Sequence, residues 1–422
     1  MHENKYTFRD PVHGFIGFND LEWDIINSPA FQRLRRIRQL AWTDYVYPGA
    51  MHTRFEHSMG VCHIASRLFD AIIKRNMGVL RSDYNFMDSG IDRQRQIIRL
   101  AALMHDLGHG PFSHASEEVF PEKSEGKKFV HEDYSAHIAT SMIGDIIRNH
   151  SYNTNNFGIS IDQITDIFSP TSKETSSVLW KEIISGQMDA DRMDYLLRDS
   201  YHCGVSYGRY DLDRVVDTLC LCEDSEVGGH LVGVEEDGIH AVEGLLIARF
   251  MMFTQVYFHK TRVIFDHHYE EALKSILAVD GGHFPTPIGD ELRKYFDWDD
   301  WKVQAELRLG NGGEHGTRLM NRDHYRLVYS TPEIPSAQEL EKYDEAVAKL
   351  APEKVVLKDA RKSWYKFQKE EIRVQTRTNG NAVAVPLATR STIVNGLATV
   401  NQRSIYVPQD YRQTAIKILG RS

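Results

Sequence analysis

Apolar residues recur at helical spacing through much of the first 280 residues. This spacing predicts a helix that begins at Ser28-Pro29, where a capping residue precedes a proline suited to the first turn. Its apolar stripe consists of Phe31, Leu34, Ile37 and Leu40. Further helices are predicted over 56–76, 132–149, 176–199 and 240–279. Another is predicted over the apolar stretch from Ile97 to Met104, and Gly108 is placed to end that helix.

The rest of the pattern predicts shorter elements. Residues 1–20 suggest strands and turns, and the polar stretches 80–92 and 150–158 suggest surface connections. After about residue 280 the pattern of apolar and polar residues changes. A helix is predicted there over 336–350, and strands with alternating residues are predicted over 371–376 and 404–408. The fold class expected is therefore mainly α, with a smaller mixed α/β lobe at the C-terminal end.

Composition narrows the class of protein. A hydrophobic share of 41% and a charged share of 26% over 422 residues are ordinary for a globular protein. The net charge of −9 argues against a general nucleic-acid binder. Four scattered cysteines do not form a disulfide framework, and no signal peptide or apolar run of about 18 residues is found. We therefore expect a cytoplasmic protein without membrane contact.

Histidines cluster in one short region, with five of them between residues 105 and 137. His57, the adjacent pair His105-Asp106, and Asp191 are the candidate metal ligands, and three helices must converge to bring them together. Two imidazoles and two carboxylates suit an intermediate divalent ion such as iron, manganese or zinc. A single histidine on an amphipathic helix is more often packed or solvated, so the set carries the argument and its members alone do not.

Several short motifs, in this order, resemble the HD-domain phosphohydrolases and, among them, the dNTP triphosphohydrolases. They are 31–40, 47–50, Arg54-Phe-Glu-His-Ser-Met-Gly60, His105-Asp-Leu-Gly-His-Gly-Pro-Phe-Ser-His114 and Asp191-Arg-Met-Asp-Tyr195. The resemblance covers about residues 5–275. It implies an HD-domain helical fold and an enzyme that releases deoxynucleoside and intact triphosphate. Residues 1–280 would form the phosphohydrolase core, and 281–422 a helical or mixed lobe for regulation or oligomerisation.

The resemblance also implies residue roles. The metal would be held by His57, His105, Asp106 and Asp191, while Mg²⁺ or Mn²⁺ would accompany the triphosphate. His114 is expected to protonate the leaving 5′-alkoxide, and His109 and His131 to position the phosphates; with Asp106 they form the catalytic set. Substrate contacts are expected from Arg54, Gln39, Leu40, Arg192, Tyr195, Asp199, Arg249, Tyr257 and Lys260. Tyr195 and Asp199 would hold the sugar 3′-hydroxyl, and Tyr257 would exclude a ribose 2′-hydroxyl. Arg249 and Lys260, 11 residues apart, would share one helix face.

A nucleotide regulatory site is implied less completely. Arg9, Asn27, Gln32 and Arg35 occupy its positions, although Asn27 replaces the acidic residue of the guanine-sensing animal enzyme. The expected partners are a dNTP, a regulatory nucleotide and further copies of the chain in a dimer or tetramer. Such an enzyme would balance dNTP pools or deplete them as a defence against phage.

Two alternative functions are open. One is an HD phosphodiesterase acting on cyclic or oligonucleotide substrates, although Gly110-Pro111-Phe112 stands where that class has Gly-Tyr-Pro. The other is a non-catalytic nucleotide sensor or single-strand binder, which the arginine-rich stretch 33–38 favours.

Overall fold

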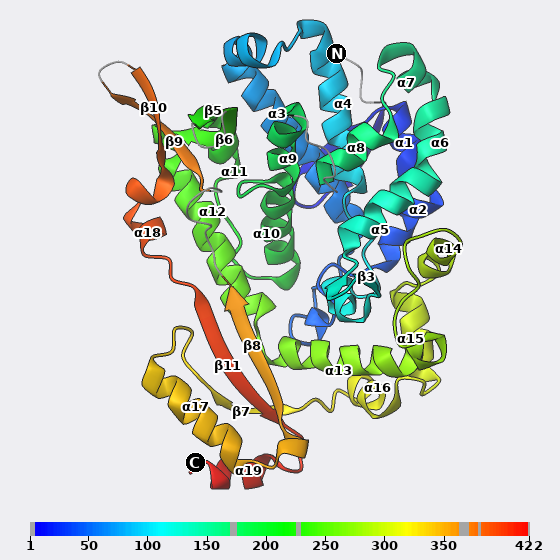
Figure 1. Cartoon of the computed structure of the whole chain (residues 1–422), viewed down its shortest axis with the longest axis vertical. Helices are drawn as coiled ribbons and strands as arrows, with labels where there is room; N and C mark the ends of the chain where they lie inside the picture. The colour runs from blue at the N-terminus through cyan, green and yellow to red at the C-terminus, as the bar shows by residue number, and fades with distance from the viewer. Residues whose placement is uncertain (1–4, 169–174, 225–228, 363–370, 379–380, 421–422) are drawn as a thin grey trace.

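The computed structural model describes residues 5–168, 175–224, 229–362, 371–378 and 381–420. The protein is mainly helical with a smaller strand-containing C-terminal part, as the sequence predicts. In Figure 1, β8 (Val356–Lys362) and β11 (Val400–Val407) run from the helical body down to a lobe that contains α17 (Ala337–Lys349) and α19 (Arg412–Ile418).

Long helix α3 lies at the centre of the body, where it packs against α4 and α10. Its apolar side chains Val61, Ile64, Leu68 and Ile72 recur at helical spacing and are buried. Helix α3 spans Arg54–Tyr84. The remaining helices of the described chain, besides α17 and α19, are α1 (Asp20–Ile26), α2 (Pro29–Gln32), α4 (Asp88–Met104), α5 (His131–Ile138), α6 (Gly144–Asn149), α7 (Ser151–Asn156), α8 (Ile161–Phe168), α9 (Thr175–Ser185), α10 (Ala190–Cys203), α11 (Leu212–Asp217), α12 (Ile239–Met252), α13 (Lys260–Leu277), α14 (Glu291–Phe296), α15 (Asp300–Arg308), α16 (Gly313–Met320) and α18 (Thr392–Asn395).

Among the described residues, the strands form four small sheets. β1 (Tyr6–Asp10) and β2 (Gly14–Phe18) lie where the sequence predicts short strands and turns, and they pair as an antiparallel hairpin. A four-stranded sheet has the order β10-β9-β6-β5, in which only β6 and β9 are parallel, and the lobe contains the antiparallel sheet β7-β11-β8. The remaining bounds are β3 (Glu122–Ser124), β4 (Lys127–Lys128), β5 (Leu219–Asp224), β6 (Gly229–Glu235), β7 (Arg326–Ser330), β9 (Arg373–Thr378) and β10 (Asn381–Pro386).

The helix predicted from Ser28-Pro29 through Leu40 is wrong in its second half. α2 ends at Gln32, and a 3-10 turn continues it only to Arg36. Ile37 then takes an extended conformation, with φ −120° and ψ 109°, and the next residues form a loop. The four stripe residues are nevertheless buried, which is why their spacing resembles that of a helix.

The predicted connections and helix bounds also need correction. Stretch 80–92 is mostly helical, because α3 continues to Tyr84 and α4 begins at Asp88. In 150–158 the short α7 forms instead of a loop, with most of its residues exposed. A π-helical turn, Ala139–Ile143, interrupts the helix predicted over 132–149, and residues 186–189 separate α9 from α10.

The helix predicted over 240–279 is in fact two helices. α12 ends at Met252, a π-helical turn spans Phe253–Tyr257, and α13 begins at Lys260. The backbone turns at Phe258, with φ −98° and ψ 14°, so helical periodicity does not carry across. The prediction that Arg249 and Lys260 share one face is therefore wrong.

Burial shows how the chain is divided. One large core extends past residue 280, since Phe284, Tyr295 and Leu319 belong to it, while a small second core surrounds Val328 and Ile405 in the lobe. The domain boundary at 280 stays a prediction. One stretch, Glu236–Tyr257, has the length and composition of a membrane-crossing helix, but 56% of its most apolar window is buried inside the protein, as in a core helix.

Candidate metal centre and cavity

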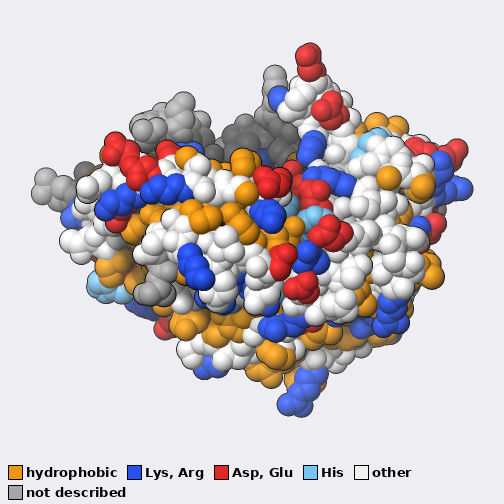
Figure 2. All heavy atoms as spheres, turned by 90° about the horizontal axis from the view of Figure 1, so that it is seen from below, with side chains coloured by type: hydrophobic (Ala, Val, Ile, Leu, Met, Phe, Trp, Pro, Cys, Tyr) orange, Lys and Arg blue, Asp and Glu red, His pale blue; other side chains and the backbone are white. Residues whose placement is uncertain are grey.

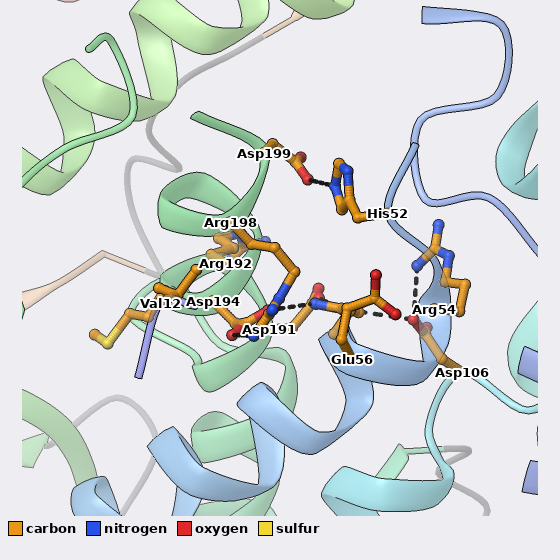
Figure 3. A network of polar contacts seen from close by, with 12 residues as sticks. Val12, His52, Arg54, Glu56, Asp106, Asp191, Arg192, Asp194, Arg198 and Asp199 are labelled. Atoms are coloured by element: carbon orange, nitrogen blue, oxygen red, sulfur yellow. Dashed lines mark hydrogen bonds and ion pairs between the residues drawn. The ribbon is translucent and has the colours of Figure 1, made fainter. Parts of the chain in front are cut away.

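Three helix ends bring four potential metal ligands together. His57 lies in the first turn of α3, which Thr53 caps. His105 and Asp106 directly follow the end of α4, and Asp191 lies in the first turn of α10. Figure 3 shows Asp106 beside Arg54 and Asp191 on the helix that also carries Asp194. The convergence predicted from the sequence is present.

The ligand atoms of His57, His105 and Asp106 lie within 4.8 Å of one another, close enough to share one ion, and Asp191 lies beside both imidazoles. Nε2 of His57 is 3.0 Å from Oδ1 of Asp191 and 3.5 Å from Oδ2 of Asp106. Nε2 of His105 is 3.3 Å from Oδ1 of Asp106. Within the described chain, both Nε2 atoms are buried without a hydrogen-bond partner. Because such orphaned atoms are costly, the donor set fits a divalent ion that would satisfy them.

The opposite nitrogen of each imidazole is fixed by a hydrogen bond. Nδ1 of His57 donates to Oδ2 of Asp194 at 2.8 Å, and Nδ1 of His105 donates to the Ala102 carbonyl at 2.7 Å. With the proton on Nδ1, the lone pair of Nε2 is left for a metal. The rings are therefore oriented before any ion binds.

Asp194 is itself held by a buried network. Arg198 donates to both of its oxygens, at 2.8 and 2.9 Å, and also to Asp10 at 2.8 Å. His13 contacts Oδ1 of Asp194 at 2.7 Å. A Cβ atom on Gly60 of α3 would overlap Oδ1 of Asp194, so glycine at this position permits the close approach of the two helices. Through Asp194, this network fixes the orientation of the His57 ring.

The charges of the four groups favour a cation. Burial lowers the pKa of His57, but the adjacent carboxylates of Asp191 and Asp194 raise it to about 10. Burial raises the pKa of Asp106, but Arg54 and His105 hold it well below its usual range. The imidazoles of His105 and His57 likewise depress the pKa of Asp191 against the effect of burial. Two carboxylates thus stay ionised around nitrogens that readily bind positive charge.

Three further histidines surround Glu117. Nδ1 of His114 and Nδ1 of His131 donate to the same oxygen, Oε1, at 2.8 and 2.7 Å. The ring of His109 stacks on that of His131 with centroids 3.9 Å apart. Burial lowers the pKa of His131, but the bond to Glu117 and the charge of Glu132 raise it overall. An imidazole that gains a proton readily therefore faces the same space as His114.

A cavity of about 580 Å³ opens over both groups, a size typical of small-molecule sites. Its lining contains most of the residues predicted to act on substrate: Gln39, Leu40, Arg54, His105, Asp106, His109, His114, His131, Asp191, Arg192, Tyr195, Asp199, Arg249 and Tyr257. His57 is fully buried beside this lining.

The cations of the cavity differ from the predicted set in one position. Lys260 lies outside this cavity, because the break before α13 turns it toward Arg326 and Arg412 around a separate space of about 200 Å³. Arg262 lines the cavity in its place. Arg54 donates to Asp106 at 2.6 Å and to Ser113 at 2.9 Å, so its guanidinium is fixed between the metal ligands and the histidine-bearing loop.

The four predicted regulatory residues lie outside the cavity. Gln32 donates to the Ile26 carbonyl at 2.7 Å and accepts a bond from Arg35 at 2.9 Å. Arg9 and Asn27 are exposed. Their role stays a prediction.

Sequence reasoning missed several residues of the site, namely Glu117, which binds two of the cavity histidines without lining the cavity itself, and some of the lining residues. Glu117 could have been found, because it stands three residues after His114 at the spacing of one helical turn. Phe168, Ile184, Phe253 and Phe258 also line the cavity, but apolar residues cannot be told from core residues in the sequence. Arg262 could not be found because its placement depends on the helix break.

A helical fold with a His/His-Asp/Asp cluster at its centre defines an HD-type protein. Residues 54–199 match the family model of the HD domain, and residues 210–419 match that of an HD-associated region. The chain therefore belongs to the family of proteins with an HD domain and an HD-associated region.

Known proteins resemble the chain to different extents. It is 40% identical over 254 residues to the uncharacterized protein YwfO of Bacillus subtilis, covering 60% of this chain and 52% of the relative. It is 33% identical over 242 residues to the deoxynucleoside triphosphate triphosphohydrolase SAMHD1 of Mus musculus, covering 51% and 34%. The chain spans about half the length of the curated relatives that it matches first.

Solved structures share the fold along almost the whole chain. A hypothetical protein from Aquifex aeolicus has a TM-score of 0.80 and 30% identity, with 98% of this chain and 99% of that one covered. A phosphohydrolase from Bacteroides thetaiotaomicron has a TM-score of 0.70 at 24% identity, with 96% and 100% covered, which shows the fold alone. The fold thus includes the C-terminal part.

Proposed function

We propose that the protein is a metal-dependent triphosphohydrolase that converts a dNTP into the deoxynucleoside and inorganic triphosphate. The observation that carries the proposal is a single cavity that joins the buried His/Asp cluster, the histidines around Glu117 and a set of arginines. A triphosphate carries several negative charges, and its transfer is catalysed mainly by positioning and charge stabilisation. Arg54, Arg192, Arg249 and Arg262 supply that charge.

His57, His105, Asp106 and Asp191 would hold the divalent ion, and their mixed donors suit iron, manganese or zinc. When bound, the ion would lower the pKa of a water molecule and so supply a nucleophile near neutral pH. Mg²⁺ or Mn²⁺ would accompany the triphosphate. Asp194 keeps His57 oriented for this role through its bond to Nδ1.

His114 is the proposed proton donor. Its Nδ1 donates to Glu117 at 2.8 Å, so Nε2 is left to carry the transferred proton into the cavity. In the reaction the water oxygen bonds to the α-phosphorus while the bond from phosphorus to the 5′-oxygen breaks. The leaving 5′-alkoxide takes the proton from Nε2 of His114, and Glu117 orients the ring through Nδ1.

The opposite end of the cavity would hold the sugar. Gln39 and Leu40 come from the loop before α3, Tyr195 and Asp199 from α10, and Tyr257 from the π-helical turn. Tyr257 is buried with its hydroxyl on Asp199 at 2.6 Å. A fixed aromatic wall there favours deoxyribose over ribose on steric grounds.

Regulation and assembly are part of the same proposal. A nucleotide bound near Arg9, Asn27, Gln32 and Arg35, and a dimer or tetramer in the cytoplasm, would control activity for dNTP balance or phage defence. Figure 2 shows hydrophobic groups between charges of both signs on the lower face, and exposed large side chains of the protein include Trp301 and Leu309. Such groups are suited to contacts between copies.

The direct test is incubation with each dNTP and NTP, alone and in pairs, with Mn²⁺ or Mg²⁺. We expect inorganic triphosphate and deoxynucleoside from dNTPs, little from NTPs, and none with Asp106→Ala or Asp191→Ala, which should also lose bound metal. Release of pyrophosphate or phosphate as the only inorganic product would contradict the proposal. Faster turnover with paired nucleotides would support a regulatory site.

A further inference from the structure

Both carboxylate oxygens of Asp199 are already bound by protein donors. Tyr257 donates to Oδ2 at 2.6 Å, and Nε2 of His52 donates to Oδ1 at 2.7 Å, the contact that Figure 3 shows. Asp199 is 1% exposed yet lines the cavity. A carboxylate oxygen accepts two bonds, so each retains acceptor capacity toward a ligand. Asp199 can therefore bind a ligand group only if that group donates, as a hydroxyl does.

His52 links separate walls of the cavity. Its carbonyl accepts a bond from the backbone N–H of Gln39 at 3.0 Å, while its side chain holds Asp199 of α10. Arg54 follows two residues later at the start of α3. His52 thus connects the loop that carries Gln39, the carboxylate of Asp199 and the start of α3, where Arg54 lies.

The plane of the His52 ring is fixed by a second histidine. The rings of His52 and His202 stack with centroids 4.4 Å apart and an interplanar angle of 11°. Burial and the neighbouring His52 lower the pKa of His202. A Cβ atom on Gly49 would collide with the His202 carbonyl, which shows how closely this loop packs on α10. Rotation of the His52 ring away from Asp199 would break this stacking.

We propose that His52 is a positioning residue: it holds the Asp199 carboxylate toward the sugar 3′-hydroxyl already expected there, so that the preference for nucleotides with a 3′-hydroxyl over 3′-deoxy analogues depends on His52. This inference rests on the proposed triphosphohydrolase function. Without His52, Oδ1 loses its donor and the carboxylate can rotate toward Tyr257 or toward water. A site built to bind a substrate hydroxyl rejects the analogue that lacks it, and such discrimination depends on a preorganised acceptor.

The test compares kcat/KM for dATP and 2′,3′-dideoxy-ATP, scored as triphosphate release, in the full chain. For the wild-type protein we expect a preference for dATP of at least about 10-fold, the value of one good hydrogen bond. His52→Asn has an amide too short to reach Asp199 and should bring the ratio close to one, mainly through a higher KM for dATP. His52→Gln places an N–H near the original Nε2 position and should retain most of the preference.

His137→Asn is the matched control, because His137 is exposed on α5 outside the cavity lining. If His52→Asn keeps the wild-type ratio, or if it slows both nucleotides equally, the positioning role is overturned while the triphosphohydrolase function stands. If the wild-type protein releases triphosphate from no dNTP, the proposed function fails, and the sugar-reading role fails with it. Thermal melting separates these outcomes from misfolding, and comparison of the Gln and Asn variants keeps the test decisive.

Discussion

The carboxylate of Asp300 accepts a hydrogen bond from the backbone N–H of Phe112 at 2.7 Å. Its second oxygen accepts one from the N–H of Arg38 at 2.9 Å. Asp300 is 2% exposed at the start of α15, beyond the HD domain, whereas the two amides belong to loops that lead to His114 and Gln39. Phe112 has φ 58°, a left-handed conformation that is uncommon for a non-glycine residue. One carboxylate from the HD-associated region therefore holds two loops of the candidate site.

Replacement of Asp300 should loosen both loops. Asp300→Ala leaves two buried N–H groups without partners, and we expect a loss of about 1–3 kcal/mol in the free energy of unfolding. Triphosphate release should fall more than stability alone explains, because His114 is carried by one of these loops. Urea unfolding and steady-state kinetics measure the two effects. Asp297→Ala, at an exposed position of the same segment, is the control; equal behaviour of the two variants would refute the role of Asp300.

Gly60 should tolerate no side chain. Gly60→Ala would force a methyl group onto Asp194 and Arg198, disturbing the bond that orients His57, so both bound metal and stability should fall. Gly78 lies in the same helix, and a Cβ atom there would meet nothing within 4 Å. Gly78→Ala should therefore be neutral or stabilising by up to about 1 kcal/mol. Metal content per chain and thermal melting compare the pair, and a wild-type metal content in Gly60→Ala would contradict the packing argument.

His268 should make stability depend on pH. Its Nε2 accepts a bond from the Tyr325 N–H at 3.1 Å and its Nδ1 lies 2.8 Å from Nδ1 of His315. Burial and the neighbours His315 and His267 lower the pKa of His268 to about 3, whereas an unfolded histidine has a pKa of about 6.5. Between these values the unfolded state binds more protons. The contribution is thus present above about pH 6.5 and is lost as the pH falls toward 3.

His268→Gln removes this titration. Urea unfolding between pH 7 and 5 should show a shallower decline for the variant, by up to about 1.4 kcal/mol per pH unit. His137→Gln, which changes an exposed histidine, should follow the wild-type slope. Identical slopes for the wild-type protein and His268→Gln would disprove the assignment.

Variants of Arg262 and Lys260 distinguish the observed break between α12 and α13 from the single continuous helix that apolar periodicity predicts. Arg262 lines the cavity and Lys260 does not, so Arg262→Ala should raise KM for a dNTP about 10-fold, as expected for one lost charged contact of about 1.4 kcal/mol. Lys260→Ala should leave KM for that dNTP within about 2-fold in the absence of a second nucleotide. Steady-state kinetics decide between them. A larger effect from Lys260 would favour the continuous-helix account.

The sequence predicted those parts of the site that depend on local pattern. His57, His105, Asp106 and Asp191 could be named because each stands in a short motif at a helix end. What it could not predict depends on backbone turns that apolar spacing does not record. Ile37 and Phe258 end helical periodicity although buried residues continue at helical spacing around them. Contacts such as Asp300 with Phe112 join residues 188 positions apart and leave no local trace.

The most direct test of the central claim is hydrolysis of a dNTP in ¹⁸O-labelled water with mass analysis of both products. Water attacks the α-phosphorus, and the bond between that phosphorus and the 5′-oxygen breaks. This reaction places one ¹⁸O atom in the triphosphate and none in the deoxynucleoside. We predict this pattern for the wild-type protein, and no product with Asp191→Ala. Label in the deoxynucleoside, or in a nucleoside monophosphate formed instead, would contradict the account.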